Sequence, residues 1–170
     1  MMGCPTRASS YLFVFIGSQK ERFYLYIFDM MKTIDENKRG AIDMEFHMKE
    51  NGFSTTTTYG TLDISSEEAY GFRPYQLLVS SIAVCSGGVL RKIMEKRRQK
   101  VNDIHIKANV TRSGVGANEV QKIHLHFTVE AENVTEEQME KNMRITRKNC
   151  SMIQSVKDSI DIIETFELRL

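Results

Sequence analysis

Apolar and polar side chains alternate along the chain from residue 42, and this alternation predicts the first strands. The period is that of a strand with one buried face, and its apolar positions are Ile42, Met44, Phe46 and Met48. Asn51-Gly52 then gives a strong hairpin signal, because both residue types accept a positive φ. Residues 54–59 predict the returning strand, and residues 60–66 predict a third short strand or a loop.

The segment after Pro74 is apolar on nearly every side and predicts a long, buried helix. Its apolar positions are Leu77, Leu78, Val79, Ile82, Ala83, Val84, Val89 and Leu90. Pro74 suits the first helical turn, since the N–H that proline lacks would have no partner there. Gly87 and Gly88 each cost about 1 kcal/mol relative to alanine inside a helix, so we expect another backbone to approach them. The basic end at 91–100 complements the negative end of the helix dipole.

Regular patterns continue after this helix. Residues 104–110 and 123–129 alternate in polarity around the flexible turn 113–118, which predicts an antiparallel hairpin. Thr135 with Gln138 forms a capping box for a helix that runs to about residue 148.

The chain is expected to end on a helical turn and a strand. Cys150 opens the helical turn, which extends to about residue 159, and residues 160–168 are β-branched and apolar enough to form the closing strand. The element order is β-β-(β)-α-β-β-α-α-β, which predicts one α+β domain over residues 41–170.

Charge and length exclude several classes of protein. A chain of 170 residues with a net charge of +1 suits one domain and has no overall field that would steer nucleic acid or a membrane surface. The apolar runs at 11–16 and 23–28 are far shorter than the roughly 20 residues that span a bilayer. The basic run 91–100 contains no interleaved aromatic residue, so it favours a solvated helix end over a nucleic-acid site.

Residues 1–40 do not follow the regular pattern, and we leave them out of the fold prediction. They are either an N-terminal extension or the result of a mis-assigned start, with Met30, Met31 or Met44 as the true first residue. A secretory signal is disfavoured because the apolar run after Arg7 is short and lacks a small-x-small cleavage site. The protein is therefore expected to be cytoplasmic.

Three cysteines in such a chain do not form a disulfide framework. Cys4 lies in the leader, whereas Cys85 and Cys150 lie far apart in different local settings, which favours thiol chemistry over a static bridge. Cys85 could equally be a small apolar residue of a packed helix. A helix start next to Arg147 and Lys148 would lower the pKa of Cys150, so local sequence alone favours Cys150 as the nucleophile.

The four histidines offer a different chemistry. By strand parity they lie on the polar side of their strands, where imidazoles of neighbouring strands can bind Zn²⁺; they are His47, His105, His124 and His126. His124 and His126 lack carboxylate or cysteine companions, so we expect no metal site.

Two motifs resemble the OsmC/Ohr family. Arg73-Pro74-Tyr75-Gln76-Leu77-Leu78, followed by Ser80-Ser81-Ile82-Ala83-Val84-Cys85, is similar to the family's Pro-x-Glu-Leu-Leu helix that leads to a cysteine. Asn149-Cys150-Ser151-Met152 is similar to the family's Cys-(Pro)-Val segment. With the element order, the resemblance covers about residues 42–170.

The resemblance implies a fold and an activity. The fold would be an intertwined homodimer, with antiparallel sheets wrapped around long buried central helices and thiol sites near the dimer interface. The activity would be reduction of organic hydroperoxides: Cys85 would attack the hydroperoxide, Cys150 would resolve the product as a disulfide, and an external dithiol would restore both. No metal or nucleotide cofactor is implied.

One departure from the family pattern concerns the charged groups beside the reactive thiol. Peroxidase members carry a glutamate one or two residues after the motif's proline to hold an arginine, but here those positions are Tyr75 and Gln76. Arg73 is the candidate arginine, with Glu67 or Glu68 as its carboxylate. The alternatives are an OsmC-like member that binds a small thiol-reactive or apolar ligand without peroxidase activity, and a structural or metal-binding dimer.

Deleting everything before Ala41 should leave the melting temperature within a few degrees of that of the full chain, because termini without a burial pattern seldom stabilise a core. Thermal unfolding of the two proteins measures the difference. A large loss of stability would show that residues 1–40 pack on the domain.

Overall fold

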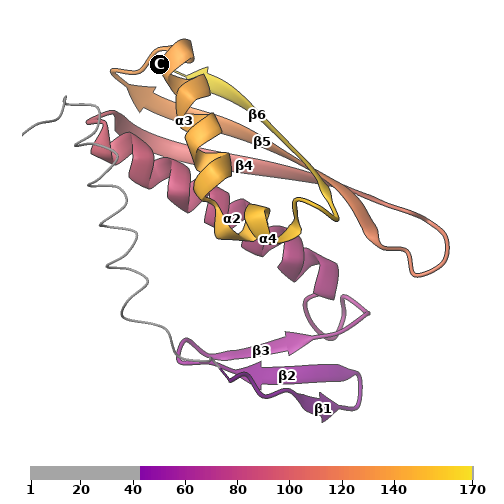
Figure 1. The fold of residues 1–170 in the computed structure, drawn as a ribbon. Coiled ribbons are helices and arrows are strands. Elements are labelled where there is room, and N and C mark those ends of the chain that lie inside the picture. The colour runs from indigo at the N-terminus through magenta and orange to yellow at the C-terminus, as the bar shows by residue number, and fades with distance from the viewer. Residues whose placement is uncertain (1–42, 170) are drawn as a thin grey trace, which may run out of the picture. The chain divides into compact units, whose positions relative to one another are not determined.

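The computed structural model describes residues 43–169, and Glu45–Leu170 form one compact unit. The expectations for residues 1–40 lie outside the described residues. This part is an α+β fold, as predicted (Figure 1). Its elements, in chain order, are β1 (His47–Lys49), β2 (Gly52–Thr56), β3 (Thr61–Ile64), α2 (Pro74–Lys96), β4 (Lys100–Arg112), β5 (Val120–Glu132), α3 (Glu136–Asn149), α4 (Ser151–Val156) and β6 (Asp161–Arg169).

The first sheet is antiparallel, in the order β1-β2-β3. The predicted hairpin is present, but its turn consists of Glu50 and Asn51, and Gly52 already belongs to β2 with a φ of 134°. A Cβ at Gly52 would collide with the carbonyl oxygen of Ile64 on β3, so the glycine serves close strand packing as well as the turn. Within the described part of the predicted strand at 42–48, residues 43–46 are not in a strand and β1 begins at His47.

Helix α2 starts at Pro74, as predicted, and ends at Lys96. At its first turn the side-chain oxygen of Gln76 accepts a hydrogen bond from the Arg73 backbone N–H at 3.1 Å. At its end Arg98 adopts a φ of 58°, which turns the chain into β4.

Only one face of α2 is buried within the single chain. Ile82, Leu90 and Met94 are fully buried, and the helix packs against β4, α3 and α4 (Figure 1). Val84 is 72% exposed and Gly88 faces open space, so the prediction of burial on every side holds for one face only. The length and composition of α2 would also suit a membrane span, but the core helix of a folded domain has the same properties.

The two glycines of α2 have different surroundings. A Cβ at Gly87 would lie 2.7 Å from Cδ1 of Ile106 on β4, so the expected close approach involves a side chain and not a second backbone. Nothing lies within 4 Å of a Cβ built on Gly88.

The second sheet has the order β4-β5-β6 and is mixed. Strands β4 and β5 form the predicted antiparallel hairpin, but β6 pairs with β5 in parallel, so the prediction of antiparallel sheets is wrong for this pair. The reason is the connection: α3 and α4 carry the chain back to the start of β5, as a parallel neighbour requires. The predicted capping box of α3 is present, with Gln138 N–H donating to Thr135 Oγ1 at 3.3 Å.

The core lies between the second sheet and the helices. Its fully buried apolar residues come from α2, β5, α3 and the α4 region. They include Ile82, Leu90, Met94, Ile123, Leu125, Phe127, Val129, Met139, Cys150 and Ile153. Cys150 is thus part of the core itself, which determines its chemistry.

Candidate active site

Cys85 and Cys150 are neighbours within one chain. Cys85 lies in the middle of α2 and is half-buried, whereas Cys150 is fully buried between α3 and α4. The two thiols are close enough for each to affect the pKa of the other, and the Cys85 sulfur lies 3.7 Å from Ser151 Oγ. Both cysteines are free thiols. The structure therefore brings together the two cysteines that the sequence predicted as a pair.

The backbone at Cys150 explains how these groups meet. Cys150 has extended dihedral angles, φ −77° and ψ 107°, and separates α3 from α4. Its N–H still donates to the carbonyl oxygen of Thr146 at 2.9 Å, and its own carbonyl accepts from Gln154 N–H at 3.0 Å. One extended residue thus ends one helix and begins the next, and the N–H groups at the new helix start are oriented toward Cys85.

Hydrogen bonds stabilise the thiolate of Cys85. Burial by itself raises the pKa of this thiol, but hydrogen bonds from Met152 N–H, the Cys150 thiol and Ser151 outweigh it, so the pKa lies below its ordinary value. The donors that lower this pKa are all uncharged.

Cys150 has the opposite electrostatic setting. Burial raises the pKa of Cys150 to about 11, and its hydrogen bond to Cys85 and the negative charge of Cys85 add to the rise. Cys150 is therefore a protonated thiol near neutral pH. The local sequence favoured a lowered pKa at this helix start, but it did not reveal that Cys150 would be fully buried.

Arg147, expected beside Cys150, is turned toward a carboxylate. Its Nη1 donates to the carbonyl oxygen of Ile162 at 2.8 Å and to Glu164 at 3.3 Å. Glu164, whose side chain is 5% exposed, also accepts a hydrogen bond from Ser86 at 2.8 Å. An acid–arginine pair thus lies next to the helix turn that carries Cys85. The sequence signal that we missed was a glutamate at an inward position of β6.

Arg73 is not brought to Cys85 within one chain. It pairs with Glu68 at 3.6 Å and lies over the ring of Tyr75 at 5.1 Å. Along the axis of α2, Arg73 lies about 18 Å before Cys85, because each helical residue rises by roughly 1.5 Å. The predicted Arg73–Glu68 pair is therefore present, while Gln76, at the family's acid position, caps the helix.

The histidines show no convergent ligand set. His124 and His126 both hydrogen bond to Thr165 Oγ1, at 2.8 Å each. Within residues 43–169, no group of three or more His, Cys, Asp or Glu side chains is placed to hold a metal ion.

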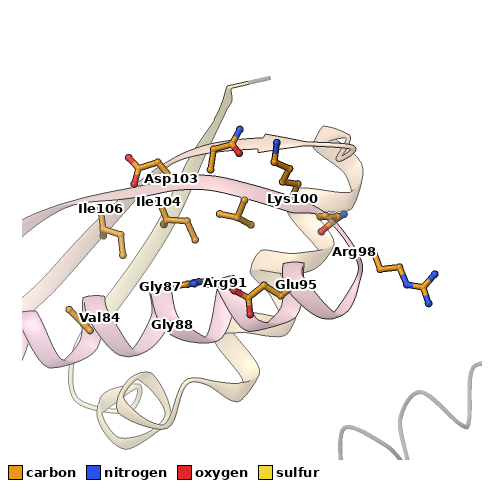
Figure 2. Close-up of a pocket in the computed structure, with 13 residues that line it drawn as sticks. Val84, Gly87, Gly88, Arg91, Glu95, Arg98, Lys100, Asp103, Ile104 and Ile106 are labelled. Carbon is orange, nitrogen blue, oxygen red and sulfur yellow. Dashed lines mark hydrogen bonds and ion pairs between the residues drawn. The ribbon is translucent and has the colours of Figure 1, made fainter.

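A groove of about 870 Å³ separates α2 from β4 but contains neither cysteine. Figure 2 shows Ile104 and Ile106 pointing from β4 toward α2, with Gly87, Gly88 and Val84 on the helix side. Its rim is polar and includes Arg91, Glu95 and Lys100. This groove is therefore separate from the thiol site.

Several solved structures have the same fold, and the match to this chain extends over nearly their whole length. A hypothetical protein from Aquifex aeolicus is 25% identical, with a TM-score of 0.68 over 76% of this chain and 97% of that one. An OsmC-like protein from Mycoplasma pneumoniae is 15% identical, with a TM-score of 0.70 over 78% and 100%. The organic hydroperoxide resistance protein OhrB of Bacillus subtilis is 16% identical, with a TM-score of 0.55 over 74% and 98%.

No protein of curated function matches the sequence. The family model described as OsmC-like protein matches residues 65–165, which contain both Cys85 and Cys150. The chain therefore belongs to the OsmC-like protein family.

Proposed function

We propose that this protein reduces organic hydroperoxides through Cys85 and Cys150. The observation that carries the proposal is the contrast between the two adjacent thiols: the pKa of Cys85 is lowered by hydrogen bonds, while burial raises that of Cys150 to about 11. A half-exposed thiol with a lowered pKa beside a buried, protonated thiol suits a nucleophile and its resolving partner. The likeness to proteins named for organic hydroperoxide resistance supports the substrate class.

The first step oxidises Cys85. Its thiolate attacks the terminal oxygen of the hydroperoxide, the S–O bond forms as the O–O bond breaks, and the alkoxide leaves and takes a proton from water. Cys85 becomes a sulfenic acid and the hydroperoxide becomes an alcohol.

The second step oxidises Cys150. Its sulfur attacks the sulfenic acid sulfur, a disulfide forms, and the hydroxide leaves as water with the thiol proton. An external dithiol then restores both thiols by exchange. This cycle needs no metal or nucleotide, and because it needs a supply of reducing equivalents we propose a cytoplasmic location.

We further propose that the working form is a homodimer. The groove between α2 and β4 is open and lined by Val84, Ile104 and Ile106. Met48 on β1 is 81% exposed, and Phe53 on β2 is exposed as well. Exposed apolar surface of this kind marks an interaction site. In such a dimer, Arg73 of the second copy would lie beside the Cys85 thiol, since Arg73 of the same chain is too far from that thiol.

A second candidate function rests on Tyr75 and Gln76, which replace the glutamate of peroxidase members. Gln76 is engaged in capping α2, and Arg73 pairs with Glu68 at the surface. If no arginine orients the hydroperoxide, the thiols would instead bind a small thiol-reactive or apolar ligand without turnover.

Replacing the cysteines separates their roles. Cys85→Ser should abolish turnover of an alkyl hydroperoxide with a dithiol reductant, because no nucleophile remains. In Cys150→Ser without reductant, one equivalent should be consumed and the sulfenic acid should persist, as trapping by dimedone and mass spectrometry would detect. Cys4→Ser is the matched control and should behave as wild type. If Cys85→Ser retains wild-type turnover, the assignment of the nucleophile is wrong.

Gln76→Glu tests the two candidate functions. A carboxylate can still accept the Arg73 N–H, so the fold should be retained, and turnover should stay the same or rise because the introduced carboxylate would be placed to orient an arginine. Gln76→Ala is the control, because it removes the helix cap without adding a carboxylate. Steady-state peroxide consumption measures the effect. Wild-type protein that consumes no hydroperoxide, together with gained activity in Gln76→Glu, would favour ligand binding over catalysis.

Light scattering tests the dimer. The wild-type protein should have about twice the chain mass of 19.6 kDa at micromolar concentration. Val84→Glu should shift the population toward the monomer, because it places a charge on the uncovered face of α2. Val115→Glu, at a similarly exposed residue in the β4–β5 loop, should not. A monomeric wild-type protein would contradict the homodimer.

A further inference from the structure

Ser151 is the side chain at the thiol site whose role the two-cysteine cycle leaves unassigned. Its Oγ lies 3.7 Å from the Cys85 sulfur, within the range of a hydrogen bond to sulfur. Its side chain has an exposed position at the start of α4, and its backbone N–H also donates to Cys85. One residue therefore supplies two of the donors that surround the reacting atom.

The direction of the hydrogen bond between the Ser151 hydroxyl and the Cys85 sulfur depends on the protonation state of Cys85. When Cys85 is a thiol, either the sulfur or the hydroxyl can donate. When Cys85 is a thiolate, it has no proton, so the Ser151 hydroxyl must be the donor. The contact between the two is therefore stronger in the ionised form, since a hydrogen bond to a charged acceptor is stronger than one between neutral groups.

Within one chain, neither Arg147 nor Arg73 takes this role. Arg147 donates to Ile162 and Glu164, and Arg73, the residue before α2, pairs with Glu68. The hydrogen bonds that lower the pKa of Cys85 come from uncharged groups.

We propose that Ser151 is a catalytic residue that holds Cys85 as the reactive thiolate through its hydroxyl, so that an uncharged donor does within one chain what a cation would otherwise do. This deepens the proposed hydroperoxide reduction and rests on it for its biological use. In that reaction the negative charge leaves the sulfur as the S–O bond forms and the O–O bond breaks. The Ser151 hydrogen bond then weakens, and the alkoxide takes its proton from water.

The test measures the thiolate directly. The full-length chain is alkylated with iodoacetamide between pH 5 and 10, and mass spectrometry follows the peptide that contains Cys85 separately from those with Cys4 and Cys150. Ser151→Ala removes the hydroxyl and keeps the backbone donors. At a pH below the Cys85 pKa, the alkylation rate should fall about three- to tenfold, the loss expected for one neutral donor. Above that pKa the two rates should converge, because both proteins are then fully ionised.

Two further variants serve as controls. Ser151→Thr keeps a hydroxyl and should keep a wild-type pH profile. Ser155→Ala removes a hydroxyl one turn later on α4, which hydrogen bonds to the Ser151 carbonyl; its profile should also be unchanged. An unchanged profile in Ser151→Ala would overturn the proposal. So would an equal fall in Ser151→Ala and Ser155→Ala, which would indicate a general loosening of α4.

Hydroperoxide kinetics separate this proposal from the proposed function. If wild type turns over hydroperoxide, kcat/KM of Ser151→Ala should show the same fall at low pH and the same recovery at high pH. If wild type shows no turnover but Ser151→Ala still shifts the alkylation profile, Ser151 has the proposed role and the peroxidase assignment fails. If wild type is active and the alkylation profile does not shift, the peroxidase assignment stands and the role of Ser151 is wrong.

Discussion

The contact between α2 and the turn at Cys150 is the constraint on which the candidate site depends. A half-buried thiolate loses solvation and must regain it from donors at fixed positions. Those donors lie on residues 150–152, remote in sequence from Cys85, and they reach the sulfur because Cys150 is extended between two helices. A continuous helix through this point would have used the N–H groups of Ser151 and Met152 for its own hydrogen bonds. The break between α3 and α4 is therefore what makes these groups available.

A second set of contacts keeps the two cysteine-bearing segments in register. Glu164 on β6 accepts from Ser86, next to Cys85, and pairs with Arg147, one turn before Cys150. A carboxylate that is nearly fully buried is costly unless its hydrogen bonds are satisfied, and here a hydroxyl and a guanidinium satisfy them. The same residue thus ties β6, α2 and α3 together. The charge of Glu164 therefore serves to hold these segments in place. The donors that lower the pKa of Cys85 are neutral.

Local signals in the sequence predicted the elements well and the pairing less well. Pro74 and the Thr135–Gln138 capping box each depend on contacts within a few residues, so the starts of α2 and α3 could be predicted directly. Alternation in β6 shows which residues face inward but not the direction of the neighbouring strand, which is why the parallel pairing with β5 was missed. Burial of Cys150 and the partners of Arg147 depend on tertiary packing. The two motifs therefore identified the thiol pair, while the local sequence around Cys150 gave the wrong relative acidity.

The electrostatic coupling of the two thiols gives the proposed cycle its order. Part of the rise in the pKa of Cys150 comes from its hydrogen bond with Cys85 and from the negative charge on that neighbour. While Cys85 is a thiolate, Cys150 therefore stays protonated and does not compete for the hydroperoxide. Conversion of Cys85 to a neutral sulfenic acid removes that charge, so Cys150 becomes easier to deprotonate at the moment when its sulfur is needed as a nucleophile. Burial, the larger cause of the raised pKa, persists through this step and keeps Cys150 away from external oxidants. In the proposed cycle the oxidation state of the first sulfur thus changes the acidity of the second.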